Sequence, residues 1–93
     1  MSPEQLHAIA DKSAENLKRL FEEGANEITQ AIADSMEEAQ NQSKDKITIT
    51  FAHQIKLDLI KHAQFDTLTF GVRRKLEIAS AMDDPNQMKL DLD

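Results

Sequence analysis

The side chains best suited to chemistry in this chain are its three histidines and its 17 carboxylates. His7, His53 and His62 stand at spacings that match no metal-ligand motif, and the chain has no cysteine to add a thiolate. No serine lies in a Gly-x-Ser-x-Gly elbow, and two glycines are too few for a phosphate-binding loop. Adjacent acids such as Glu22 and Glu23 are typical of a solvated helix face. These residues indicate a protein that is not an enzyme and holds no cofactor or metal.

One pair, His53 and Arg74, stands out because both interrupt an otherwise apolar alternation. Two stretches alternate apolar and polar residues, which predicts strands at about 46–60 and about 66–79, joined by a loop. In an antiparallel hairpin the residue numbers of directly opposite residues have a constant sum, and this sum must be odd if the two apolar faces are to match. A sum of 127 sets His53 opposite Arg74. We interpret the pair as a polar contact at an oligomer interface, with an acid or carbonyl from a partner element between the two side chains.

The segment before the strands predicts one long helix over about residues 3–41. Ser2, Pro3 and Gln5 form a capping box with proline at the first helical position. A narrow apolar and small-residue stripe follows with an 11-residue period. Gly24 lies on this stripe and permits two readings, a break between two helices or a point of close approach. We expect the stripe to form an oligomer interface, with Ser13, Leu17, Gly24 and Ile28 as its central residues.

Charge is distributed unevenly along the 93 residues, whose net charge is −6. Residues 1–43 carry nine acidic and three basic side chains, whereas residues 44–79 carry seven basic and four acidic ones. The first residues lack the basic and apolar regions of a signal peptide, and no apolar run approaches the roughly 20 residues that cross a bilayer. The expected location is the cytoplasm, without membrane contact.

Together these features predict a single α+β domain over residues 1–82, a long N-terminal helix followed by a long antiparallel β-hairpin. An acidic tail, residues 83–93, follows it. An isolated two-stranded sheet is marginally stable, and one helix covers little of two such strands. We therefore expect a homodimer or higher oligomer.

The tail contains Gln87-Met88-Lys89-Leu90-Asp91-Leu92. This hexapeptide resembles the motif by which many bacterial replication and repair proteins dock on the DNA sliding clamp. The resemblance covers six residues and implies Gln87 as polar anchor, with Met88, Leu90 and Leu92 as apolar contacts. It departs from the common pattern in having Met88 where leucine is usual, and in its acidic surroundings. The alternation of apolar and charged residues is also typical of a third strand. The alternative function, a structural oligomerisation module with the tail as this third strand, stays open.

A helix is followed by strands and then by an Asp84-Pro85-Asn86-Gln87 tail. In this order the whole chain also resembles small uncharacterised prophage-encoded proteins, which implies a setting in phage or mobile-element DNA metabolism. A different function is nucleic-acid binding by the polar face of the hairpin. Lys46, Lys56, Arg73 and Lys75 are expected on this face or its rim. Threonines accompany them, but no aromatic residue is expected there to stack on a base.

Overall fold

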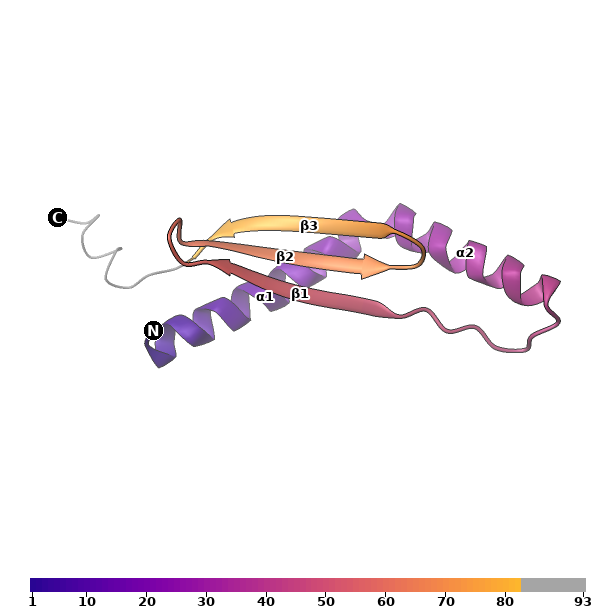
Figure 1. Ribbon diagram of the computed structural model, residues 1–93, viewed down its shortest axis with the longest axis horizontal. Coiled ribbons are helices and arrows are strands. Elements are labelled where there is room, and N and C mark those ends of the chain that lie inside the picture. The colour runs from indigo at the N-terminus through magenta and orange to yellow at the C-terminus, as the bar shows by residue number, and fades with distance from the viewer. Residues whose placement is uncertain (83–93) are drawn as a thin grey trace.

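The computed structural model describes residues 1–82, which form two helices followed by a three-stranded antiparallel sheet (Figure 1). The elements are α1 (Pro3–Glu23), α2 (Ala25–Asn41), β1 (Phe51–Asp58), β2 (Ala63–Phe70) and β3 (Arg74–Ala81). The strand order is β1-β2-β3, and the helices lie on one face of the sheet. The predicted α+β fold, helix first and antiparallel strands after, is confirmed. Gln87, Met88, Leu90 and Leu92 lie outside the described residues.

The helical region covers the predicted residues but is divided at Gly24. At its start, Ser2 and Gln5 form the predicted capping box, with Gln5 N–H donating to Ser2 Oγ at 3.2 Å. At Gly24, the amide donates to Leu20 O and the carbonyl accepts from Ile28 N, each at 2.9 Å. Helical hydrogen bonds therefore exist on both sides, while α2 leaves in a new direction (Figure 1). Both readings of Gly24 hold in part: it is a bend and a point of close approach.

Gly24 is required by packing, because its φ of −94° is accessible to any residue. A Cβ atom placed there would overlap Leu76 Cδ1 of β3 and lie 2.8 Å from Leu20 O. The absence of a side chain thus lets the helix axis approach the sheet where α1 ends. The close approach involves a strand of the same chain.

The strands differ from the predicted hairpin in number. The stretch predicted as one strand over 66–79 is divided by a turn at residues 71–73, in which Gly71 and Arg73 have φ of 61° and 59°. Val72 forms the tip and is 87% exposed. The predicted single strand was wrong because a three-residue turn keeps even-numbered residues on the same face before and after it. The apolar alternation continues through the turn without a change of parity.

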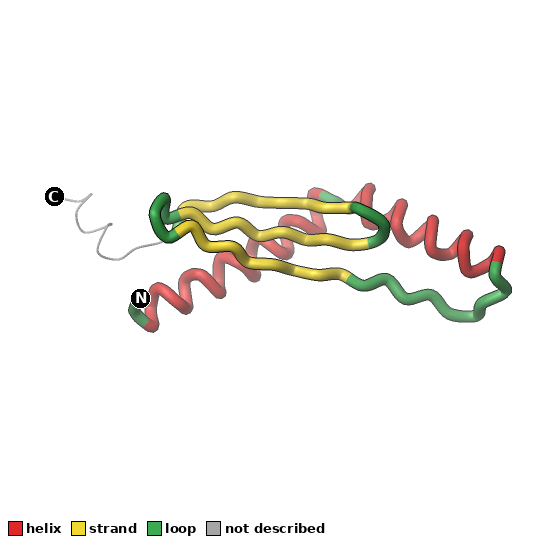
Figure 2. Tube along the Cα trace, in the orientation of Figure 1, coloured by secondary structure: helices red, strands yellow, loops and turns green. Residues whose placement is uncertain are grey.

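The register also differs from the prediction. Phe51 lies opposite Phe70 and His53 opposite Leu68, so opposite positions of β1 and β2 sum to 121, not 127. The sum is odd, as matching apolar faces requires, but β1 begins only at Phe51. Residues 46–50, predicted as strand, are extended and unpaired, within the long segment that returns from α2 to β1 (Figure 2).

The apolar core is small and lies around the bend of the helices. Its buried members are Leu20, Ala31, Leu68 and Phe70. Phe51 stacks on Phe70 with ring centroids 5.3 Å apart. The molecule is elongated, with a Cα radius of gyration of 17.9 Å, against about 12 Å for a compact domain of similar length. Such a shape buries little apolar surface per residue.

Gly24→Ala tests the close approach. Alanine raises intrinsic helix stability by about 1 kcal/mol, yet we expect a net loss of about 1–3 kcal/mol from overpacking against Leu76. Chemical denaturation measures the free energy of unfolding. In a Leu76→Ala background the same substitution should cost clearly less, because only the contact of the new Cβ atom with Leu20 O remains. A loss of equal size in both backgrounds would contradict the packing argument.

Candidate functional site

A cluster of polar side chains is buried between α1 and the sheet. Four of its members are buried, Ser80 is partly buried and His53 is more exposed, and every strand contributes to it. They are Ser13 and Asn16 of α1, His53 of β1, Gln64 and Asp66 of β2, and Ser80 of β3. We name these six residues the polar cluster.

Asp66 is the centre of the polar cluster and is fully buried. Its Oδ1 accepts hydrogen bonds from Asn16 Nδ2 at 2.9 Å and from Gln64 Nε2 at 3.2 Å. Its Oδ2 lies 2.8 Å from His53 Nε2. Three side chains from three elements therefore converge on one carboxylate, which satisfies the polar groups that burial would otherwise leave without partners.

Opposing effects set the pKa of Asp66. Burial raises it, but hydrogen bonds from Asn16, Ser13 and His53 and the charge of His53 lower it further, so that the pKa lies below its ordinary value. The carboxylate is accordingly ionised near neutral pH. An ionised group at full burial makes the surrounding donors necessary to the fold.

Asn16 links the carboxylate to the third strand. Its Nδ2 donates to Ser80 Oγ at 2.9 Å as well as to Asp66. Its Oδ1 is the one buried side-chain polar atom without a partner within residues 1–82. Rotating the amide by half a turn would direct this oxygen at the carboxylate, so Asp66 fixes the orientation and leaves Oδ1 unpaired. The cluster therefore contains one buried acceptor without a hydrogen bond, on the side of α1.

The His53–Asp66 pair resembles the histidine–acid pair of many hydrolases, in which the acid orients the histidine. The side chain of His53 is 24% exposed, whereas Asp66 has no exposure. Ser13 Oγ and Ser80 Oγ accept hydrogen bonds from Gln64 and Asn16, while His53 Nε2 is bonded to Asp66. The hydrogen bonds of the cluster join elements of the fold, which is the arrangement expected of a group that fixes their relative positions.

The predicted contact between His53 and Arg74 is wrong. Arg74 begins β3 and its side chain reaches α2, where it donates to Glu27 O at 2.8 Å and to Asp34 Oδ2 at 2.7 Å. Each of the two residues does meet an acid of this chain, but the acids are different, and His53 and Arg74 do not share one. The shifted register separates them, since β1 pairs with β2 rather than with the residues of β3.

The residues predicted for an oligomer interface along the helix lie against the sheet of the same chain. Ser13 is 3% exposed and Gly24 is also buried. Leu17 and Ile28 are partly buried and pack against the apolar core. Within a single chain, Ser13 and Gly24 are therefore covered by intramolecular contacts, and Leu17 and Ile28 are covered in part.

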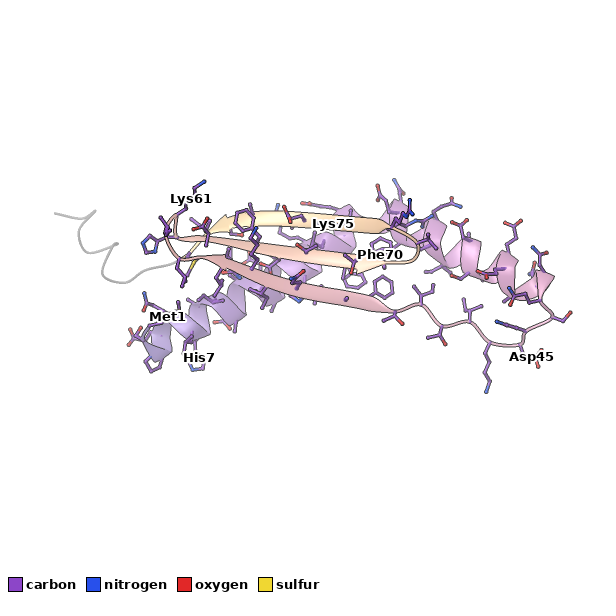
Figure 3. All side chains as sticks on the ribbon, viewed as in Figure 1. Met1, His7, Asp45, Lys61, Phe70 and Lys75 are labelled. Carbon is purple, nitrogen blue, oxygen red and sulfur yellow. The ribbon has the colours of Figure 1, made fainter. Side chains whose placement is uncertain are left out.

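The outer face of the sheet carries an aromatic residue that the sequence reasoning placed in a loop. Phe65 belongs to β2 and faces away from the helices, by alternation with buried Gln64 and Asp66. Lys56 Nζ of β1 lies 5.4 Å from the centroid of its ring. Figure 3 labels Lys75 on β3 and Lys61 on the β1–β2 turn. A shallow groove crosses the strands at the end of the sheet near the β2–β3 turn and is lined by Thr50, Ala52, Thr69, Arg73 and Lys75, among others.

Across residues 1–82, no three side chains of His, Asp or Glu gather closely enough to hold a metal ion. Neither described helix combines the length and apolar character needed to cross a membrane.

Asp66→Asn tests the role of the carboxylate. We expect a loss of about 3 kcal/mol in the free energy of unfolding at pH 7, because the donors around it lose a charged acceptor. Since the folded-state pKa is below the ordinary value of about 3.9, the carboxylate contributes its full stabilisation above about pH 5 and loses it as the pH falls through the folded-state pKa.

Denaturation between pH 2 and pH 7 measures both effects. The fall in the free energy of unfolding at low pH should become smaller in Asp66→Asn. It should persist in Asp11→Asn, which alters an exposed acid of α1. Identical pH profiles for all three proteins would contradict the assignment.

Comparison with known proteins yields no relative: no family model matches the chain, and no curated protein or solved structure is significantly similar to it.

Proposed function

We propose that the chain is a non-enzymatic, self-associating interaction protein whose C-terminal tail docks on the bacterial DNA sliding clamp. The observation that carries this proposal is the hexapeptide at residues 87–92. The setting that follows from it is DNA replication or repair in a bacterial cytoplasm, by a protein that a phage or mobile element encodes.

The chemistry of the tail suits a peptide ligand. An extended segment presents alternate side chains to a groove, as Met88, Leu90 and Leu92 would be presented. Methionine adapts to irregular apolar pockets. Gln87 both donates and accepts hydrogen bonds at the entrance of such a groove.

The end of the described chain supports this use of the tail. Met82 N–H donates to His62 O at 2.8 Å, which fastens the chain beside the β1–β2 turn. This turn lies at one end of the elongated molecule (Figure 1). A peptide that begins here can bind a partner without unfolding the sheet or the helices.

Self-association is supported by the small apolar core. Several large apolar side chains stay exposed within the described chain, among them Ile55 at 45% and Ile60 at 91%. Short chains often compensate for a small core by oligomerisation. Two or more copies would also display several tails to a ring-shaped partner, which raises avidity without new contacts.

The tail is tested by affinity capture from bacterial lysate. Intact protein should retain the sliding clamp, and the Gln87→Ala, Leu90→Ala double variant should lose it, with binding at least tenfold weaker when purified clamp is titrated. Lys89→Ala is the matched control, since its position is variable in the motif. Equal recovery by the intact protein and the double variant, or recovery by neither, contradicts the docking proposal.

Thermal unfolding separates docking from a third-strand role. Deleting residues 86–93 should leave the melting temperature unchanged within about 2 °C if the tail is a ligand. A fall of about 5 °C or more, the shift expected for about 1 kcal/mol in a domain of this size, supports the alternative of an added strand.

A second function, nucleic-acid binding, is favoured by the position of Phe65. The outer sheet face combines an aromatic ring with Lys56 and Lys75, and Arg73 lies at its rim. Stacking on aromatic rings and phosphate contacts from lysine and arginine are the usual means of binding single strands. Acidic side chains are concentrated on the helices, so the negative charge of the chain lies mainly on the opposite layer.

Fluorescence anisotropy with a labelled 20-nucleotide single strand measures this binding. We expect binding at 20 mM salt that weakens at least tenfold at 200 mM salt, and a further tenfold loss in the Lys56→Gln, Lys75→Gln variant. Lys12→Gln, Lys18→Gln on α1 removes the same charge from the other layer and should leave the affinity nearly unchanged. Absence of binding at low salt removes this function.

A further inference from the structure

The open edge of β1 is the longest unpaired stretch of extended backbone among the described residues. β1 lies at one edge of the sheet and is hydrogen-bonded to β2 alone. Residues 46–50 continue its extended path without a strand partner, beside the second half of α2 (Figure 2). An edge of this kind is a template for pairing with another chain.

The side chains along this edge are apolar on the helix side and remain uncovered. Ile55 and Leu57 are 45% and 36% exposed, because α1 packs mainly on β2 and β3. Ile47 is 40% exposed in the unpaired extension. In Figure 1 the first turns of α1, which include exposed Leu6, extend past the edge of β1. They overhang the space that an added strand would occupy.

We propose that a second copy of this chain fills this space and pairs antiparallel with β1 about a two-fold axis at Ala52. The two sheets then become one six-stranded sheet with all four helices on the same face. This inference deepens the proposed self-association by naming its surface and register.

The register follows from the alternation. Opposite positions must have an even sum, so that odd-numbered apolar residues of both copies share the helix face. A sum of 104 is the choice that pairs the whole extended stretch 46–58 with its counterpart. Leu57 then faces Ile47 of the second copy, and Ile55 faces Ile49 of the second copy.

The charges and sizes of the facing side chains agree with the register whose residue numbers sum to 104. Asp58 lies opposite Lys46 of the second copy at each end of the paired stretch, which places opposite charges together. Ala52, a small residue, meets itself at the axis. A sum of 112 would instead set Lys56 opposite itself, and like charges directly opposite destabilise a sheet. The overhanging start of α1 would cover the apolar extension of the second copy.

Single cysteines test the register, since the chain has none of its own. At the axis, the two Cβ atoms of Ala52→Cys should lie about 5 Å apart, within reach of a disulfide. Gln54→Cys is the matched control on the same strand and face. Its two copies should lie about 14 Å apart, four residues along the strand, which is too far. An equal mixture of Thr50→Cys and Gln54→Cys proteins should form a mixed disulfide, because these positions face each other.

Mild oxidation of the full chain at about 50 µM, read by non-reducing electrophoresis, gives the outcome. We expect at least tenfold more disulfide-linked dimer for Ala52→Cys than for Gln54→Cys. Analytical ultracentrifugation of the unaltered protein should give a dimer mass or a multiple of it. Equal or greater cross-linking at Gln54, no cross-linking at Ala52, or a monomer mass overturns the proposal. These measurements use the protein alone, so their result is independent of whether the tail binds the clamp.

Discussion

The fold depends on one buried carboxylate, that of Asp66. An ionised group removed from water is tolerated only when donors replace its hydration. Here the donors come from α1 through Asn16, from β1 through His53 and from β2 itself through Gln64. Asn16 also donates to Ser80, which attaches β3 to the same point. Any sliding of α1 along the sheet would withdraw a donor from the carboxylate, so the polar cluster fixes where the helix lies on the strands.

The polar cluster fixes the position of α1 along the strands, and the apolar core fixes the distance between the helices and the sheet. Gly24 brings the end of α1 against Leu76, and Leu20, Leu68 and Phe70 fill the space beside it. Arg74 holds α2 to the start of β3 through Glu27 O and Asp34. The polar cluster and the apolar core thus act at different places along α1, and both act mainly on β2 and β3. β1 is held from the helix side chiefly by Phe51 and His53, which leaves Ile55 and Leu57 uncovered.

Local signals allowed the sequence to predict the helix limits, the capping box and the α+β fold, because these depend on neighbours within a few positions. The division of 66–79 escaped prediction because the turn at Gly71–Arg73 preserves parity and its tip is an apolar valine. The turn between β1 and β2 was obscured in the same way, since exposed Leu59 and Ile60 occupy it. There Asp58 Oδ1 accepts from the amides of Ile60 and Lys61 and stabilises the turn. The polar cluster had one detectable signal: Asp66 lies on the same parity as Leu68 and Phe70, so a buried acid was to be expected. Its donors could not be identified, because Asn16 is 50 positions away and the register was wrong.

The two edges of the sheet differ in a way that bears on assembly. β3 begins next to Arg73 and continues with Arg74 and Lys75, and charged residues of this kind protect an edge from pairing. β1 and its extension form a straight apolar alternation without proline or a recorded bulge, and Lys46, Lys56 and Asp58 are the charged residues of this stretch. Pairing of this edge with the β3 edge of the next copy would be heterologous and would build an open assembly. A two-fold, isologous contact closes after one pairing, because each copy uses the same edge. It leaves only the two protected β3 edges exposed, so the contrast between the edges favours a closed dimer over an open assembly.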